Sequence, residues 1–196
     1  MKPLPAVAAL LACALLAACG TPQPEHYHSL LATQPEAPDT RKAMPPVVID
    51  LLPFSVPPQV DQPQWLVRQS DDSMLLLEQE RWAAPLRDEL RSAVSERLAS
   101  HWGAVDVRAL ASPPADARRV RVDVLRFESL PGREARIDAS WAIASLLCRS
   151  AISERVDGAG AAALAAAHRR AVVRLADDIG RQLQALQHGE SGSCAS

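Results

Sequence analysis

The sequence carries little net charge, and this excludes one large class of functions. Its 21 basic and 23 acidic residues give a formal net charge of -2 at pH 7. A protein that binds DNA or RNA through the phosphate backbone needs a concentrated positive field. This composition supplies none, so we expect no nucleic acid among the partners of the protein.

The sequence signatures of common catalytic and nucleotide-binding sites are also missing. The chain has no Gly-x-Ser-x-Gly nucleophile turn, no phosphate-binding loop, no Gly-x-Gly-x-x-Gly and no His-Glu-x-x-His. Its histidines are scattered: His26 and His28 can lie on one side of a strand, but no third metal ligand stands near them. We therefore expect no enzyme activity, no cofactor and no bound metal ion.

The longest apolar run is too short to cross a membrane. Residues 6–18 are apolar or small and follow the single charge of Lys2. A helix of this length covers roughly 20 Å at about 1.5 Å per residue, against about 30 Å of hydrocarbon in a bilayer. The pattern is typical of an export signal, so we expect residues 1–18 to be a signal peptide that is removed.

The residues that close this run, Leu16-Ala17-Ala18-Cys19, resemble the lipobox of bacterial lipoproteins. In that motif the cysteine thiol receives a diacylglyceryl group, and cleavage leaves the cysteine as the first residue. We expect lipidation of Cys19 to hold the protein on a membrane, because several acyl chains bind more firmly than one. The alternative is an ordinary secretory signal that ends in Ala-x-Ala. Gly20, where an aspartate would favour the inner membrane, favours the periplasmic face of the outer membrane.

Cysteine is scarce after the signal. Of the four cysteines in the chain, Cys13 leaves with the signal and Cys19 is acylated on this interpretation. An oxidising periplasm favours a disulfide between the two that remain, Cys148 and Cys194. A buried Cys148 with a free thiol in the C-terminal tail is the alternative, and the sequence leaves both open.

The rest of the composition indicates one domain with flexible ends. Residues 19–25 lie in a proline-rich region and form an acylated tether, residues 26–187 form a single domain, and residues 188–196 form a flexible tail. At the start of the domain we expect a short strand over residues 27–31 and then a loop to Pro45.

Apolar spacing predicts two helices and two hairpins within the domain. One helix is predicted around a stripe with a four-residue repeat and ends at Gly103, and a second covers residues 161–186. The stripe of the first consists of Leu86, Leu90, Val94 and Leu98. Turns at residues 70–73 and at Pro131-Gly132 separate alternating runs that predict hairpins. This order of elements favours an α+β fold, with a mixed or mostly antiparallel sheet and two amphipathic helices packed on one face.

The run from residue 118 to residue 130 alternates with the period of a strand. It places Val120, Val122 and Val124 on one face, with Arg126 as a further candidate for that face. The other face receives Arg121, Asp123, Leu125 and Phe127. We expect a partner or a lipid to bind the sheet face that the helices leave uncovered, and the charges indicate that part of this face is wet.

A candidate partner-binding set precedes the first helix and consists of Trp65, Glu80, Arg81 and Trp82. An exposed tryptophan would be an interaction anchor. The alternative, which we favour for both indoles, is that they cover the core at the start of the helix. In that case Glu80 and Arg81 form a local ion pair.

These segments together resemble the PqiC-type family, the auxiliary lipoprotein components of ABC-type and MCE-associated transport systems. The similarity rests on Cys19 with its short tether, the strand with Tyr27, Ser29 and Leu30, and three longer segments. Those segments are "VVIDLLPFSVPPQVDQPQWLVRQ", "LEQERWAAPLRDELRSAVSERLA" and "RVRVDVLRFE". Two features depart from the pattern: His28, where the family often has a second tyrosine, and the cysteine-bearing tail.

The resemblance implies a part in moving lipid, or in maintaining the lipid asymmetry of the cell envelope. It implies as partners a periplasmic MCE-domain transport protein and the associated inner-membrane components, with the membrane itself bound through the acyl anchor. On this resemblance the protein would act by binding other proteins, and binding of lipid stays open. A structural or assembly lipoprotein that does not contact lipid cargo stays open as an alternative. Self-association into a homo-oligomer also stays open.

Overall fold

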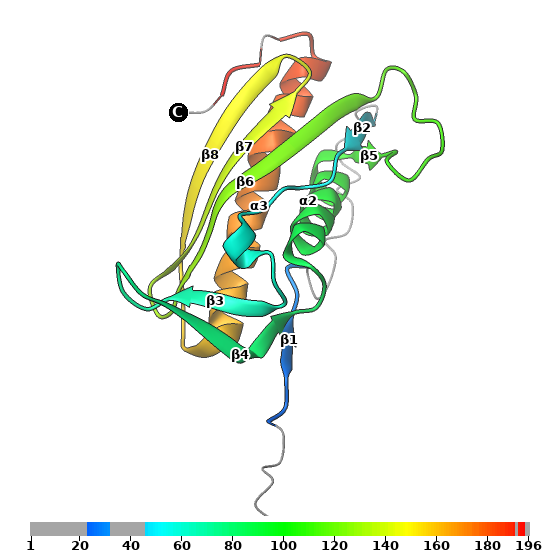
Figure 1. Ribbon diagram of the computed structural model, residues 1–196. Coiled ribbons are helices and arrows are strands. Elements are labelled where there is room, and N and C mark those ends of the chain that lie inside the picture. The colour runs from blue at the N-terminus through cyan, green and yellow to red at the C-terminus, as the bar shows by residue number, and fades with distance from the viewer. Residues whose placement is uncertain (1–22, 32–45, 191, 195–196) are drawn as a thin grey trace, which may run out of the picture.

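The computed structural model describes residues 23–31, 46–190 and 192–194, and its strands form two sheets (Figure 1). One sheet has three strands in the order β1-β4-β3, and the other has five in the order β5-β2-β6-β7-β8. The strands are β1 (His26–His28), β2 (Val47–Leu51), β3 (Gln64–Arg68), β4 (Met74–Trp82), β5 (Ala104–Asp106), β6 (Arg118–Leu130), β7 (Glu134–Ile143) and β8 (Leu146–Arg155). The helices are α2 (Leu86–Trp102), α3 (Gly160–Gln187) and the short 3-10 helix η1 (Pro58–Val60).

The five-stranded sheet is mixed. Strand β2 runs parallel to both β5 and β6, whereas β7 runs antiparallel to both β6 and β8. The turn at Pro131-Gly132 joins β6 to β7, and Gly132 adopts a φ of 68°, a left-handed conformation that glycine accepts without strain. These features confirm the predicted α+β class and the predicted second hairpin.

Both predicted helices are present. Helix α3 covers β7 and β8, and α2 packs beside α3 and reaches β5 (Figure 1). All four residues of the predicted stripe of α2, from Leu86 to Leu98, are buried. Gly103 ends this helix at a φ of 66° and donates its backbone N–H to the carbonyl of Leu98. The apolar spacing therefore predicted the correct face and the correct end of the helix.

The predicted faces of β6 hold as far as Leu125 and are wrong from Arg126 onward. The pairing of β6 with β7 shifts between Val124 and Arg126, so Leu125 is an extra residue that forms a β-bulge. A bulge reverses the alternation, and Phe127 therefore joins Val124 on the buried face while Leu125 is exposed. Strict period-two alternation cannot show where such an extra residue sits.

A second sheet was not part of the prediction. Strands β3 and β4 form the predicted hairpin around residues 70–73, but the hairpin belongs to a separate sheet in which β4 also pairs with β1. The first strand is also shorter than expected, since it covers His26–His28 instead of residues 27–31. Among the described helices, none is both long enough and apolar enough to span a bilayer.

Candidate attachment and docking site

The N-terminal segment is fastened to the domain at the end of strand β4. Strand β1 runs parallel to β4, with His26 beside Glu80, Tyr27 beside Arg81 and His28 beside Trp82. Just after the strand, the carbonyl of His28 accepts a 2.8 Å hydrogen bond from the backbone N–H of Ala83. Residues more than fifty positions apart in the sequence thus form one small sheet at the end of the molecule from which the N-terminal segment leaves (Figure 1).

On one side of this sheet, the carboxylate of Glu80 bonds both histidines of β1. It lies 3.2 Å from Nδ1 of His26 and 2.5 Å from Nε2 of His28. Partial burial raises the pKa of Glu80, but the hydrogen bonds from His28 and His26 outweigh this effect and leave the pKa below its usual value. Glu80 therefore stays ionised and ties β1 to β4.

On the other side, Arg81 bonds Glu25 instead of Glu80. Its guanidinium donates to a carboxylate oxygen of Glu25 at 2.6 Å, and the hydroxyl of Tyr27 donates to the other oxygen at 2.6 Å. The bond from Tyr27 and then the bond from Arg81 lower the pKa of Glu25. The expected local ion pair between Glu80 and Arg81 is therefore wrong, because neighbouring residues of a strand point to opposite faces.

A third fastening is a buried carboxylate that the sequence analysis missed. Glu89, in the first turn of α2, accepts hydrogen bonds from the backbone N–H of Leu30 at 2.7 Å and from the hydroxyl of Ser29 at 2.8 Å. Arg169 of α3 donates to the carbonyl of Ser29 at 3.1 Å. Glu89 stands three residues after Leu86, on the apolar stripe of α2. A carboxylate on a buried stripe needs hydrogen-bond donors, and this is the feature of the sequence from which the site could have been predicted.

Both candidate tryptophans lie in the core, so neither is an exposed anchor. Trp65 is 2% exposed and Trp82 is 5% exposed. Their ring centroids are 4.3 Å apart, and the ring of His28 lies 4.8 Å from that of Trp65. The partner-binding hypothesis for these two indoles is corrected to the core alternative, because hairpin β3–β4 packs its inner face against Phe127 of β6 and His168 of α3.

An apolar pocket of about 380 Å³ lies beside the attachment site. One edge of Trp82 lines it, together with Pro63 and residues 83–85. At its rim Arg87 forms an ion pair with Asp61. A pocket with apolar walls and a charged rim can receive an apolar side chain of a partner protein.

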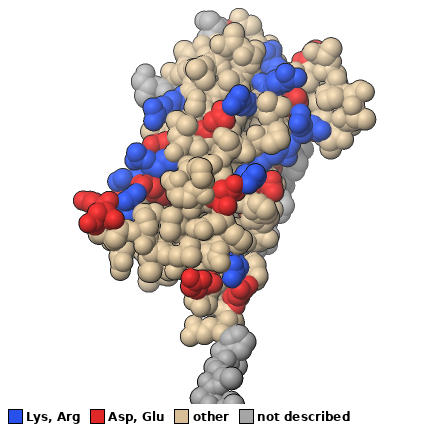
Figure 2. All heavy atoms as spheres, in the orientation of Figure 1, with Lys and Arg blue, Asp and Glu red and all other residues tan. Residues whose placement is uncertain are grey.

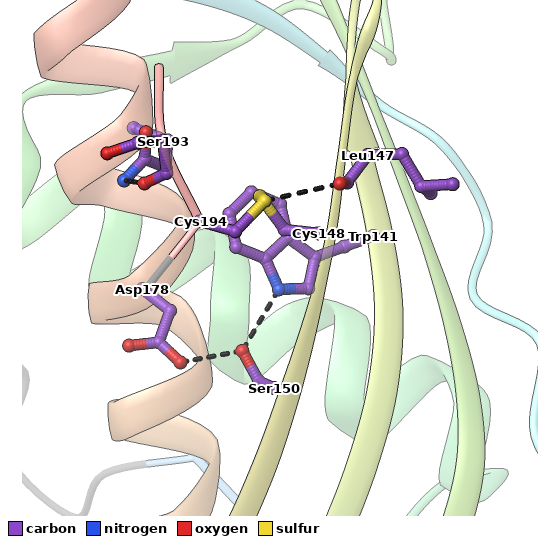
Figure 3. Close-up of a disulfide and its surroundings, with 8 residues drawn as sticks. Trp141, Leu147, Cys148, Ser150, Asp178, Ser193 and Cys194 are labelled. Atoms are coloured by element: carbon purple, nitrogen blue, oxygen red, sulfur yellow. Dashed lines mark hydrogen bonds between the residues drawn. A yellow bond between two sulfur atoms is a disulfide. The ribbon is translucent and has the colours of Figure 1, made fainter. Parts of the chain in front are cut away.

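The C-terminal tail is fastened to the far end of the domain by a disulfide. Cys148 of β8 and Cys194 are joined, with Cα atoms 5.4 Å apart, and Figure 3 shows the tail between β8 and α3. Below the disulfide, the indole N–H of Trp141 donates to Ser150 at 3.0 Å, and Ser150 donates to Asp178 of α3 at 2.6 Å. Residues 192–194 of the tail are thus held against the fold instead of extending freely.

The described residues contain one buried pair of a type used in catalysis. Ser129 and Nε2 of His168 are 2.8 Å apart, but both side chains are buried and the imidazole stacks on Phe127 at 4.1 Å. Complete burial lowers the pKa of His168 to about 3. A neutral imidazole sealed in aromatic surroundings serves packing. In the same part of the chain, no group of three or more His, Cys, Asp and Glu residues is arranged to hold a metal ion.

The charges on the surface are mixed in sign. In Figure 2, basic and acidic residues lie next to each other across the visible face, and neither sign dominates. Such pairs include Arg121 with Asp123 and Arg126 with Asp138. A surface of this kind has no extended positive field for a polyanion. The lipidation candidate Cys19 lies outside the described residues.

Comparisons with known proteins identify relatives of the fold. The family model described as "ABC-type transport auxiliary lipoprotein component" matches residues 29–180, which is more than half of the chain. No curated protein matches the sequence. The crystal structure of an uncharacterized protein superposes with a TM-score of 0.66 at 16% identity, covering 82% of this chain and 99% of the other. A Xanthomonas campestris protein of the DUF330 family superposes with a TM-score of 0.59 at 18% identity, covering 84% and 97%.

Proposed function

Since the chain belongs to the family of ABC-type transport auxiliary lipoprotein components, we propose that it is the lipid-anchored auxiliary subunit of an envelope lipid transport system. The family description itself implies association with an ABC-type transport system. In our proposal the protein sits on the periplasmic face of the outer membrane, held through Cys19. It binds a periplasmic MCE-domain protein that is linked to inner-membrane components. The observation that carries the proposal is the family match over residues 29–180.

The attachment site fits an anchored protein that has to be held in a defined position. Glu80, Arg81 and Glu89 each bond a residue of the segment 25–30, so a force on the N-terminal segment reaches β4 and α2 directly. From Cys19 to His26 the chain has seven steps, which at about 3.1 Å each allow about 20 Å of reach. The end of the domain that carries β1 and β4 therefore stays close to the membrane.

The apolar pocket beside this site is where we place a contact with the partner. Its wall residues 83–85 are small or ring-shaped, and the largely buried ring of Trp82 completes the wall. The ion pair of Arg87 with Asp61 gives the rim polar groups that can orient an incoming side chain. Binding by such a surface requires no catalytic group, in keeping with the proposed auxiliary role.

Site-specific photocrosslinking of the full chain in membranes tests the partner. A photoreactive amino acid at Ala83, which lines the pocket and is exposed, should crosslink to an MCE-domain protein. The matched control is Ala99, which is also exposed, on α2, but does not line the pocket. Absence of any transport component from the Ala83 products, or equal yields from both positions, would contradict the placement. A crosslink to an assembly factor alone would favour the structural alternative.

Metabolic labelling with a palmitate analogue tests the anchor separately. The wild-type chain should be labelled, and Cys19→Ser should lose the label and accumulate as uncleaved or differently cleaved precursor, because the thiol is the atom that accepts the diacylglyceryl group. A labelled Cys19→Ser protein would show that lipid is attached elsewhere or not through this motif.

A further inference from the structure

Strand β8 is the exposed edge of the large sheet. It is ten residues long, contains no proline, and among the described strands has β7 as its one neighbour. Long edge strands are templates for pairing with a further strand, and proteins that do not use them usually shorten, bend or cover them. The pairing of β8 with β7 is continuous from residue 146 to residue 155, without a bulge. Nothing in β8 itself therefore prevents a further strand from joining the sheet.

The backbone groups that face the open edge belong to the odd-numbered residues of β8. The carbonyl of Arg155 accepts a hydrogen bond from Arg170 of α3, and the carbonyl of Leu147 lies 3.2 Å from the sulfur of Cys194. Both carbonyls thus point away from β7. Since N–H and C=O of one residue point to the same side in an antiparallel strand, Arg149, Ala151 and Ser153 also present theirs outward.

These two contacts also limit the open part of the edge. The disulfide-bound tail occupies one end at Leu147 (Figure 3), and Arg170 occupies the other end at Arg155. Between them lies a window from Arg149 to Ser153 with Ala151 at its centre. Because the window is centred on Ala151, a second β8 can pair with it in the antiparallel direction. A two-fold axis beside Ala151 would then relate the two strands.

We propose that two copies of the chain pair through this window, β8 antiparallel to β8, with Ala151 facing Ala151 of the second copy. In this register Arg149 faces Ser153 in both directions, so no two like charges are directly opposed. The window then forms three hydrogen-bonded residue pairs, and the two five-stranded sheets become one sheet of ten. This inference does not depend on the proposed transport role.

The exposed face of β8 and the groove between β8 and α3 both favour a second copy of the chain as the partner at this edge. Leu147 is 69% exposed next to the window, where a second copy would cover part of it. A groove of about 550 Å³ runs between the open edge and α3. Its charged lining is nearly balanced and consists of Arg149, Arg174, Arg181, Asp177 and Asp178. Two such grooves can approach without a large net repulsion, whereas a strongly acidic or basic partner would gain little from them.

Cysteine crosslinking of the full chain in membranes tests the register. In a hydrogen-bonded pair the Cα atoms are about 5.5 Å apart, within the range that a disulfide spans. Ala151→Cys should therefore form a disulfide-linked dimer under mild oxidation, seen on a non-reducing gel. Leu147→Cys is the control, because Leu147 is also exposed but lies about eight residues, or roughly 27 Å, from its own copy in this register.

Three further substitutions keep the test decisive. Differently tagged chains that carry Arg149→Cys and Ser153→Cys should crosslink to each other, whereas each alone should give only background. Adding Ala151→Lys should abolish that product, because two ammonium groups then meet at the axis, while thermal melting stays unchanged since the side chain is exposed. A dimer from Leu147→Cys equal to that from Ala151→Cys, no dimer from folded Ala151→Cys, or a product with a different protein would overturn the proposal.

Discussion

One residue through which acid should destabilise this fold is His168. Its imidazole is completely buried on α3, with Nε2 bonded to Ser129 and no hydrogen-bond partner for Nδ1 among the described residues. The ring also stacks on Phe127 and meets the edges of two indoles, so no carboxylate stabilises a positive charge there. Burial therefore lowers the pKa of His168 in the folded state to about 3, from 6.5 in a solvated chain.

The sign and the size of the effect follow from these two pKa values. As the pH falls below 6.5, the unfolded chain binds a proton at His168 and the folded chain does not, so stability falls until the pH reaches about 3. Each pH unit in this window costs about 1.4 kcal/mol. Between pH 7 and pH 4.5 the loss is about 2.5 kcal/mol, a large share of the roughly 5–15 kcal/mol that stabilises a typical domain.

Urea unfolding at pH 7, 5.5 and 4.5 measures this loss against a variant that cannot titrate at the same position. His168→Gln keeps a group able to bond Ser129, and its free energy of unfolding should fall by about 2.5 kcal/mol less than that of the wild type between pH 7 and pH 4.5. His168→Phe is a second such variant. His188→Gln removes an exposed histidine and should follow the wild type. Parallel pH profiles for wild type and both His168 variants would refute the reasoning.

Three further predictions concern packing. Leu90→Ala should lower the free energy of unfolding by about 2–5 kcal/mol because it leaves a cavity under α2, whereas exposed Ser92→Ala should change it by less than about 0.5; equal urea midpoints would show that the buried face is misassigned. Gly180→Ala should destabilise by about 1–3 kcal/mol in thermal melts, since the added Cβ would lie 2.4 Å from the ring of Trp102, and a Trp102→Ala background should remove the penalty. Cys194→Ser should cost about 2–4 kcal/mol, because the disulfide closes a loop with a sequence separation of 46, and a reductant should cause a similar loss in the wild type but none in the variant.

The local sequence pattern was sufficient to predict the helices and hairpins, whose stabilising contacts join residues that are near each other in the chain. The stripe of α2, its end at Gly103, the long helix α3 and both hairpins follow from spacing and turn residues. These features depend on interactions over three or four residues, or across one turn, and such interactions are visible in the sequence itself. The class α+β followed from the order of these elements.

The candidate site was predicted only in part, because its contacts are not local. Trp65 and Trp82 were singled out as large apolar groups, but burial depends on which surface folds over them, and here that surface is β6 and α3. Glu89 was missed because its partners, Ser29 and Leu30, precede it by about sixty residues. A carboxylate on an apolar stripe indicates that some donor meets it, but not which one.

By itself, the sequence determined the export signal pattern, the apolar stripes of both helices and the family resemblance, since each is a property of residues in order. Tertiary structure alone decided that β1 pairs with β4, that Leu125 forms a bulge and turns Phe127 inward, and that β8 is left at an open edge. The reason is physical. Strand partners, register and edges are set by hydrogen bonds and packing between segments distant in the chain, and one residue of shift exchanges the two faces of a strand.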